Sequence, residues 1–501
     1  MERTDSAAFT RPQTCDARLG EALHRRTAAH PQKSGILPLS LAEDAFAARI
    51  VLARAARRSL DLQYYIWRGD TTGQLLWEAL WQAAESGVRV RLLLDDANTA
   101  GLDSTLAALD AHPNIELRLF NPFSNRRLRL LDFVLDFKRV NRRMHNKSFT
   151  VDNQVAIVGG RNIGDEYFGA STTVGFQDLD VVAIGSVVQE VSSEFDLYWN
   201  SEFSQPAGSV VAAATPEDTA TLHAGWSKLH QSAEAQRYAE AVRRTPLIAA
   251  LMDEHVPMEW TNAHVTHDDP SKVIEAADRI EFHMLSQLQE AMGKPTRTLD
   301  LVSPYFVPGK NGARALVNLA QRGVRVRVLT NSLSATDVAP VHAGYSKYRK
   351  DLLKAGVTLF ELKPGAALPS IKDADGDPTK GLPGSGSRGS TDASLHAKTF
   401  AVDERRVFVG SFNFDPRSAR LNTEMGMVID SPILAGTLST QLDGRLPNEA
   451  YEVRLTSDGR SLEWLEPGPQ GMTRHSTEPG TTRLKRLCVG FLAILPIEWM
   501  L

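Results

Sequence analysis

The chain has 501 residues, of which 42% are apolar and 23% charged, and its formal net charge is −4 at pH 7. This length is too great for one ordinary core and favours two domains, while the acidic balance offers no general attraction to a polyanion such as nucleic acid. The two cysteines, Cys15 and Cys488, lie near opposite ends, which excludes a disulfide framework or a cysteine-rich metal site and fits a reducing compartment.

Residues 1–35 read as an N-terminal extension without the apolar run of a secretory signal. A first repeat is expected over 36–204. Its opening part, LDLQYYIW…LLWEALWQAAESGVRVRLLLDD at 60–96, reads as a strand, a helix with Leu76 and Leu80 at helical spacing, and a second strand. A further strand is expected in NIELRLFNPF at 114–123. No run of about 18 apolar residues occurs anywhere, so no membrane-spanning helix is expected.

The segment RRMHNKSFTVDNQVAIVGGRNIG at 142–164 places His145 and Lys147 ahead of an apolar strand. Alternate side chains of an extended segment share a face, so both should project to the same side. Asp152 lies five residues beyond the lysine, where it is expected to brace the loop. Downstream, Asp178 in GFQDLDVVAI precedes another apolar strand, and Asp180 shares its face, so both stay open as partners of a histidine.

Residues 205–295 look helical and have no counterpart elsewhere in the chain, which makes them a candidate lid or substrate-recognition insertion. A second repeat is expected over 296–465, because LDLVSPYFVPGKNGARALVNLAQRGVRVRVLTNS at 299–332 parallels 60–96. Strand, helix and strand in alternation predict an α/β fold with a largely parallel or mixed sheet. Residues 365–392, rich in Gly, Ser, Pro and Asp, are expected to be a mobile loop that either gates the site or is a tolerated insertion.

The segment ASLHAKTFAVDERRVFVGSFNFD at 393–415 repeats the first motif without a gap. His396, Lys398, Asp403, Ser411 and Asn413 fall on His145, Lys147, Asp152, Gly160 and Asn162. Glu424, in LNTEMGMVI, occupies the place that Asp178 has in the first repeat. A packing or surface histidine does not explain why the polar residues are doubled together with the apolar ones, so the pair predicts one site built from both repeats.

The C-terminal tail, 466–501, contains RLKRLCVGFLAILPIEWML. Arg483, Lys485 and Arg486 precede a short apolar run, and Trp499 follows it. This arrangement suits an interfacial segment on an anionic membrane, and a final core helix or strand is the alternative.

Two imidazoles, two ammonium groups and two carboxamides in one pocket suit a phosphodiester. One neutral imidazole can attack phosphorus while the other, protonated, gives its proton to the leaving oxygen. The lysines and asparagines can hold the non-bridging oxygens, so neither a metal nor another cofactor is required. The attacking ring needs an acceptor on its other nitrogen, for which Glu424 and Asp178 are the candidates.

The paired segments HNKSFTVD…GGRN and HAKTFAVD…GSFN resemble the phospholipase D superfamily and, within it, the C-type bacterial cardiolipin synthases, over nearly the whole chain. The resemblance implies two α/β repeats around one shared active site and a phosphatidyl-histidine intermediate. It implies transfer to phosphatidylglycerol from a second phospholipid, with phosphatidylethanolamine as the expected donor. His145 is then the expected nucleophile and His396 the general acid, with the reverse order open. The phosphate would be held by Lys147, Lys398, Asn162 and Asn413, assisted by Ser411 and the Gly160 amide.

The expected partners are phospholipid substrates and an anionic membrane surface, and no nucleic acid. The resemblance also leaves open a small accessory protein. The expected location is the cytoplasmic face of the bacterial inner membrane, held peripherally, or the cytoplasm. Three alternatives remain: a hydrolytic phospholipase D that releases phosphatidic acid, a metal-independent nuclease of the same superfamily, and a non-catalytic lipid-binding scaffold.

Overall fold

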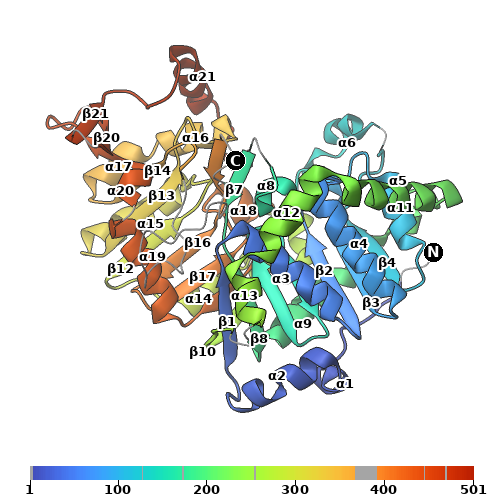
Figure 1. Cartoon of the computed structure of the whole chain (residues 1–501). Helices are drawn as coiled ribbons and strands as arrows, with labels where there is room; N and C mark the ends of the chain where they lie inside the picture. The colour runs from blue at the N-terminus through green and yellow to red at the C-terminus, as the bar shows by residue number, and fades with distance from the viewer. Residues whose placement is uncertain are drawn as a thin grey trace.

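The computed structural model of the chain describes residues 4–126, 128–171, 174–252, 256–366, 392–444, 446–468 and 471–501. Apart from its ends, the loop predicted at 365–392 lies outside these residues. The remaining residues form two large sheets that stand beside each other, each with helices on its faces (Figure 1).

The first sheet has nine strands. In spatial order they are β10 (Glu259–Thr261), β1 (Ser34–Leu39), β8 (Asp180–Gly185), β6 (Val155–Gly159), β5 (Ser148–Val151), β2 (Ser59–Tyr64), β3 (Arg89–Asp95), β4 (Ile115–Phe120) and β9 (Ser204–Pro206).

The second sheet has ten strands. They are β11 (Ala263–His267), β18 (Met425–Ile429), β17 (Arg406–Gly410), β16 (Thr399–Val402), β12 (Thr298–Val302), β13 (Arg325–Asn331), β14 (Thr358–Leu362), β19 (Ala450–Leu455), β20 (Leu462–Gly468) and β21 (Gly471–His475). A separate two-stranded sheet joins β7 (Val174–Gln177) to β15 (Asp392–Leu395).

The two sheets share the same strand order and directions. The order β8-β6-β5-β2-β3-β4-β9 matches β18-β17-β16-β12-β13-β14-β19 strand for strand. In each run the three strands β2, β3, β4 or β12, β13, β14 are parallel, and the other neighbours are antiparallel. The predicted α/β fold of two repeats with mixed sheets is therefore confirmed.

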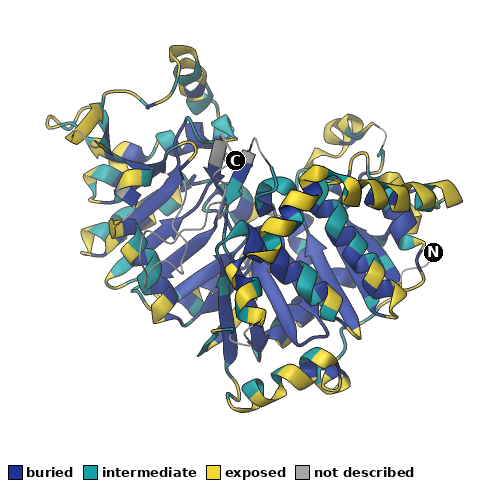
Figure 2. Cartoon of the chain, viewed as in Figure 1, coloured by how far each residue is buried: buried dark blue, intermediate teal, exposed yellow. Residues whose placement is uncertain are grey.

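Helices cover both faces of each sheet because consecutive strand residues are apolar and point to opposite faces. On β3, Leu92 packs into the core beneath α3 (Ala42–Ala55), α4 (Thr71–Glu85) and α5 (Asp103–Asp110), whereas Leu93 faces α9 (Val187–Trp199). The second repeat places α15 (Gly309–Gln321) and α17 (Arg349–Lys354) on one face and α19 (Pro432–Gly444) with α20 (Leu446–Glu449) on the other. Figure 2 shows buried strands between helices that expose their outer sides.

The remaining helices lie in the connections and tails. They are α1 (Arg11–Thr14), α2 (Arg18–Ala28), α6 (Arg129–Leu135), α7 (Phe137–Val140), α8 (Asp165–Phe168), α10 (Ala207–Val210), α11 (Pro216–Gln231), α12 (Ala233–Arg243), α13 (Pro246–Met252), α14 (Leu285–Met292), α16 (Ala339–Ser346), α18 (Pro416–Arg420) and α21 (Arg483–Ile494), with the 3-10 turns η1 (Asp96–Asn98), η2 (Pro270–Val273), η3 (Ile280–Phe282) and η5 (Glu498–Met500).

The two repeats share an apolar interface. Val158 and Val181 of the first sheet pack in one buried cluster with Val409 and Met427 of the second. The connector also joins the repeats, because β10 and β11 follow each other in the chain but belong to different sheets. Its helices α11, α12 and α13 pack on α3, α4 and α5 at the outside of the first repeat.

Candidate active site

Each motif histidine lies in an extended segment immediately before a strand. β5 begins at Ser148 and β16 at Thr399, directly after the motif lysines, so the histidines lie ahead of the strands as the sequence indicates. The ammonium of Lys147 donates to the carbonyl of His145 at 2.5 Å, and Lys398 makes the same contact with His396. All four side chains are buried.

Each histidine segment is hydrogen-bonded to the opposite repeat. The amide of His145 donates to the carbonyl of Thr423 at 2.8 Å, beside a parallel bridge between Met144 and Thr423. In the other half, the amide of His396 donates to the carbonyl of Gln177 at 2.8 Å, where β15 runs parallel to β7. The residue that follows each of these carbonyl groups is an acid, Glu424 or Asp178.

The carboxylates therefore pair crosswise with the histidines. Nδ1 of His145 lies 2.8 Å from Oε2 of Glu424, and Nδ1 of His396 lies 2.5 Å from Oδ2 of Asp178. Asp180, the alternative partner, instead forms a buried ion pair with Arg49 at 2.9 Å. Sequence reasoning found the two acids, but the pairing with the histidine of the opposite repeat comes from the fold.

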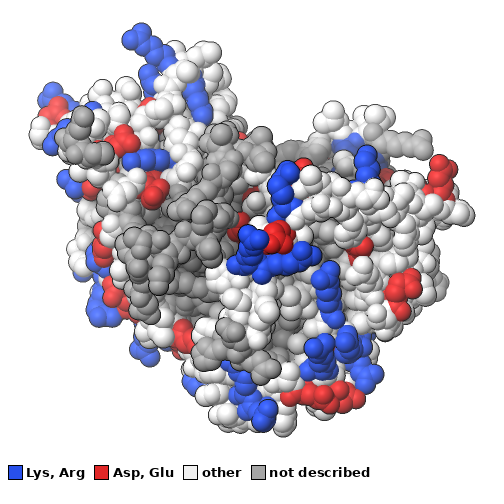
Figure 3. All heavy atoms as spheres, viewed as in Figure 1, with Lys and Arg blue, Asp and Glu red and all other residues white. Residues whose placement is uncertain are grey.

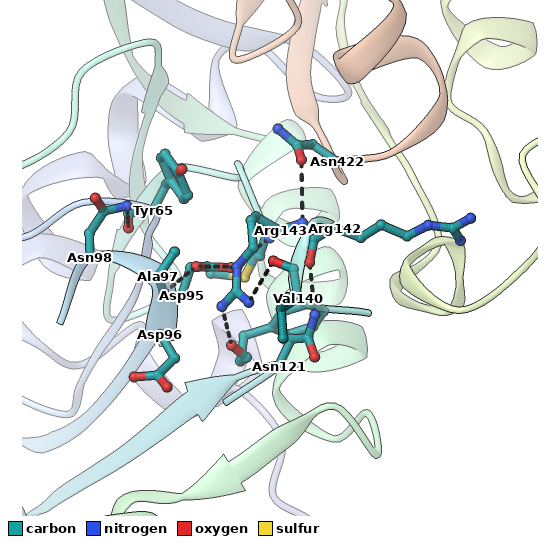
Figure 4. Close-up of polar contacts among 12 residues, drawn as sticks. Tyr65, Asp95, Asp96, Ala97, Asn98, Asn121, Val140, Arg142, Arg143 and Asn422 are labelled. Carbon is teal, nitrogen blue, oxygen red and sulfur yellow. Dashed lines mark hydrogen bonds and ion pairs between the residues drawn. The ribbon is translucent and has the colours of Figure 1, made fainter. Parts of the chain in front are cut away.

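The segment before His145 is also fixed from both sides (Figure 4). The guanidinium of Arg143 donates to both oxygens of Asp95, at 2.8 and 3.1 Å, at the end of β3. The Arg143 amide donates to the side-chain oxygen of Asn422 at 3.3 Å, and the Met144 amide donates to Asp95 at 2.8 Å. Buried charge-assisted bonds of this kind hold the backbone that presents the imidazole.

The electrostatics of the site favour neutral rings between ionised neighbours. Burial lowers the pKa of His145 to about 4, and burial together with the Lys398 ammonium lowers that of His396 to about 3. Burial raises the pKa of Glu424, but His145 and Lys147 outweigh it and bring that pKa below its usual value. Since an ionised carboxylate only accepts, Nδ1 of His145 carries the proton and Nε2 the lone pair.

The two lysines are also perturbed. Burial lowers the pKa of Lys147 to about 7 and that of Lys398 to about 8, and the Lys398 ammonium contributes to the lowered pKa of Lys147. Lys398 and His396 together outweigh the effect of burial on Asp178 and depress the pKa of that carboxyl. Two buried cations that repel each other form a site that an anion would stabilise.

Both histidines line one pocket of about 550 Å³. Aromatic rings fix the two imidazoles: Tyr65 lies edge-on to His145 with centroids 5.1 Å apart, and Tyr167 and Phe176 lie 5.2 and 5.1 Å from His396. The other lining residues come from both repeats and are Ile66, Arg68, Asn162, Glu166, Ser171, Tyr305, Asp337, Asn413, Asp415, Arg417, Ser418 and Asn422. None of the described residues of the 205–295 connector is among them.

Of the six residues expected to hold the phosphate or to assist there, two line the pocket, and both are asparagines. Asn162 lies in the pocket, where its amide donates to the Tyr167 hydroxyl at 3.0 Å and accepts from the Ile66 amide at 3.1 Å. Asn413 also lies there, and its buried side-chain oxygen has no partner among the described residues.

Gly160 and Ser411 contact the residues that carry the two carboxylates, Asp178 and Glu424. The Gly160 amide donates to the Leu179 carbonyl at 3.3 Å, and a Cβ at this position would lie 2.2 Å from Oδ1 of Asp178. The Ser411 hydroxyl donates to Oε2 of Glu424 at 2.5 Å. Neither residue lines the pocket, and neither do Lys147 and Lys398. The contacts of Gly160 and Ser411 favour a role in positioning the two carboxylates.

Asp152 and Asp403 lie away from the pocket, at the turns after β5 and β16. Asp152 accepts from the amides of Arg57, Arg58 and Ser59 at 2.7–3.3 Å, which fixes the start of β2. Asp403 makes the same contacts with the amides of 296–298 before β12. Both have positive φ, as the turn requires. These contacts fit the bracing role expected from the sequence.

Sequence reasoning missed the aromatic rings and Arg417. A signal existed for two of the rings, because Tyr65 and Tyr305 each follow the first strand of a repeat, in LDLQYYIW and LDLVSPYF. For Arg417 the local sequence gave no indication. Among the described residues, no group of three or more His, Cys, Asp and Glu side chains is arranged to hold a metal ion.

Comparison with known proteins identifies the class. The family described as "Cardiolipin synthase, PLD-like domain" matches residues 50–199 and 287–446, the two segments that contain the histidine motifs. The chain belongs to this phospholipase D-like family, and the resemblance inferred from the paired motifs is confirmed.

Individual relatives support this assignment. Cardiolipin synthase C of Escherichia coli K12 is 46% identical over 486 residues, which covers 97% of this chain and 100% of the relative. Cardiolipin synthase B of the same strain is 25% identical over 82% of this chain and 79% of its own length. The crystal structure of phosphatidylserine synthase from Haemophilus influenzae has a TM-score of 0.58 at 13% identity, covering 97% of this chain and 100% of that one, which shows a shared fold.

Proposed function

We propose that the protein is a transphosphatidylase that makes cardiolipin from phosphatidylglycerol and a second phospholipid, with phosphatidylethanolamine as the donor. The observation that carries the proposal is one pocket lined by His145 and His396, each with Nδ1 against a buried carboxylate. The similarity to cardiolipin synthase C, over 97% of this chain and 100% of the relative, supports the choice of product.

In the first step, Nε2 of His145 attacks phosphorus. A P–N bond forms, the P–O bond to the ethanolamine headgroup breaks, and His396 gives its proton to the departing oxygen. Both rings are neutral in the free protein, so His396 must first gain that proton. The bound phosphodiester is an anion beside the ring, and an anion raises the pKa of a nearby imidazole.

In the second step, a glycerol hydroxyl of phosphatidylglycerol loses its proton to His396. Its oxygen bonds to phosphorus and the P–N bond to His145 breaks, so His145 is neutral again. His396 keeps the proton it held before the first step and releases it to solvent when the anionic product leaves. The ammonium groups of Lys147 and Lys398 with the Asn162 and Asn413 side chains hold the non-bridging oxygens in both steps.

An asymmetry between the two histidines supports His145 as the nucleophile. Nδ1 of His145 contacts Glu424 as its acceptor. Nδ1 of His396 lies 2.5 Å from Asp178 but also 2.8 Å from the Lys398 ammonium, a competing donor. The tautomer that leaves the lone pair on Nε2 is therefore better defined for His145.

The protein would act on lipids at the surface of an anionic membrane, on the cytoplasmic face of the inner membrane. No helix in the described parts of the chain is long and apolar enough to cross a bilayer. Such a location requires peripheral attachment, for which the basic and apolar C-terminal segment is suited. A small accessory protein is a further partner that this proposal allows.

The proposal is tested with purified protein and vesicles that contain phosphatidylglycerol and phosphatidylethanolamine. The expected products are cardiolipin and ethanolamine in equal amounts, and the His145→Ala variant should form neither. Phosphatidic acid as the sole lipid product would assign the protein as a hydrolytic phospholipase D instead. A product that forms from phosphatidylglycerol alone would identify a different donor.

A further inference from the structure

Exposed apolar side chains gather in two segments of the described chain. In and around α6 and α7, Leu128, Leu130, Val134 and Leu135 are exposed, with Leu130 at 81%. In α21, Leu484, Leu487, Phe491 and Ile494 are exposed, with Ile494 at 82%. Isolated surface apolar residues need no explanation, but contiguous patches of this kind mark interaction sites.

The α21 helix is amphipathic. Val489, Leu492 and Ala493 pack on α16, through Ala339 and Ala343. Leu484, Leu487, Cys488 and Phe491 recur at helical spacing on the side that no described residue buries. α21 therefore packs as a core helix would on one side only, and its other side is exposed.

The two segments meet beside Arg417, a residue that lines the catalytic pocket. The rings of Phe137 and Trp499 are in edge contact, with centroids 6.4 Å apart. Arg417, which lines the pocket, donates to the Asn141 carbonyl at 3.0 Å and to the Met500 carbonyl at 2.9 Å. One pocket residue thus ties the end of α7 to the residues that follow α21.

Charge and position agree with a membrane partner. Figure 1 shows α6 and α21 projecting from the same edge of the molecule, with the C-terminus between them. Figure 3 shows Lys and Arg side chains at the α21 end of that edge and a mostly uncharged surface near α6. Lys138 and Arg483 are exposed beside the apolar residues. Apolar side chains with flanking Lys or Arg and a Trp are typical of helices that lie in the interface of an anionic bilayer.

We infer that residues 128–138 and 483–499 form one lipid-inserting surface, the apolar rim, which seats the pocket mouth on a bilayer rich in anionic phospholipid. This rests on the proposed function, because lipid substrates must pass from the bilayer into the pocket. A helix of 12 residues such as α21 spans about 18 Å, less than the roughly 30 Å of a bilayer core, so it lies in the interface and does not cross it.

Binding to vesicles tests the apolar rim. Leu130→Glu with Val134→Glu in α6, and Leu487→Glu with Phe491→Glu in α21, should each weaken binding to vesicles of phosphatidylethanolamine and phosphatidylglycerol by about tenfold or more. The control is Ile433→Glu, which replaces another exposed apolar residue at the start of α19, away from the rim in Figure 1. It should bind like the wild type, and all variants should keep the wild-type unfolding midpoint because the replaced side chains are exposed.

A fluorophore provides a second measurement that does not depend on loss of binding. In a Cys15→Ser background, a polarity-sensitive dye on Cys488 should shift to the blue when anionic vesicles are added. A dye on Val134→Cys, in a chain that also carries Cys488→Ser, should do the same. Phosphatidylcholine vesicles should give smaller shifts, because they lack the anionic charge that Lys138 and Arg483 attract.

Three results would overturn the inference: an α6 variant that binds vesicles like the wild type, a dye at position 134 that does not respond, or a wild-type chain that does not bind vesicles. In the last case the rim would be a docking surface for another protein. The proposed function fails separately, since His145→Ala should bind vesicles like the wild type. A wild-type chain that binds vesicles but transfers no phosphatidyl group would refute the function and leave the rim intact.

Discussion

Replacement of Glu424 by Gln tests the crosswise pairing of carboxylate and histidine. The Oε2 atom of Glu424 lies 2.8 Å from Nδ1 of His145, and both groups are buried. When Nε2 of His145 attacks phosphorus, the ring becomes cationic, and the carboxylate stabilises that charge. Glu424→Gln keeps the size of the side chain and removes the charge.

The size of the effect follows from this geometry. A hydrogen bond to a charged group contributes about 1.5–3 kcal/mol, and a pair of unit charges about 4 Å apart in a partly polarisable surrounding interacts by about 4 kcal/mol. A loss of about 2–4 kcal/mol of transition-state stabilisation corresponds to a fall in kcat of roughly 30- to 1000-fold. KM should change little, because the carboxylate touches the imidazole and not the lipid.

The assay compares two donors, phosphatidylethanolamine and a phosphatidyl ester of p-nitrophenol, in single-turnover experiments. The p-nitrophenol group leaves without a proton, so the defect of Asp178→Asn, which acts through the general acid His396, should largely disappear with this donor. The defect of Glu424→Gln should persist, because it lies in the attack itself. Activity of Glu424→Gln within about threefold of the wild type on both donors would refute the reasoning. Rescue of Glu424→Gln and not of Asp178→Asn would exchange the roles of the two histidines.

Three further predictions concern the supports of the site. Gly160→Ala should reduce kcat by about tenfold or more while the protein stays folded. The added Cβ would lie 2.2 Å from Oδ1 of Asp178 and displace that carboxylate from His396. An unchanged kcat would contradict this role. Asp152→Ala should lower the free energy of unfolding by about 2–4 kcal/mol in urea titrations. Asp403→Ala should lower it by less, because Asp152 is fully buried whereas Asp403 is partly exposed. Equal losses would show that burial does not set the difference. The free energy of unfolding should also fall as the pH decreases from about 6.5 to about 4. In that range both histidines are protonated in the unfolded chain but stay neutral in the folded protein, which lowers the free energy of unfolding by up to about 1.4 kcal/mol per pH unit for each ring. In a double His145→Gln, His396→Gln variant, the free energy of unfolding should fall less steeply with pH.

The repeat and the two motifs could be predicted because their signals are local. The LDL strand, the amphipathic helix and the GVRVR strand occur twice in the chain, and their order fixes the matching order of strands in the two sheets. His145 and His396 were identified by the doubling itself, and no single motif would have carried the same weight.

The pairing of charges could not be predicted, because it depends on contacts between distant parts of the chain. Glu424 reaches His145 since Thr423 bridges to Met144, and Asp178 reaches His396 since β7 pairs with β15. The family resemblance alone implies a place for the Gly160 amide at the phosphate. The space that its missing side chain leaves for Asp178 is visible only in three dimensions. The exposure of Leu130 and Val134 is likewise a tertiary property, since the same residues would suit a buried helix.

The proposed mechanism requires a covalent bond between His145 and phosphorus. The measurement that tests it uses the His396→Ala variant and the p-nitrophenol donor with a labelled acyl chain. Attack by His145 on this donor needs no general acid, because p-nitrophenolate leaves without a proton. Transfer to an acceptor needs His396 as the base, which this variant lacks, so the intermediate should accumulate. Peptide mapping under mildly alkaline conditions should find an acid-labile phosphatidyl adduct on His145, absent from the double His145→Ala, His396→Ala variant. A label on another residue, or turnover of this donor at the wild-type rate without an adduct, would contradict the account.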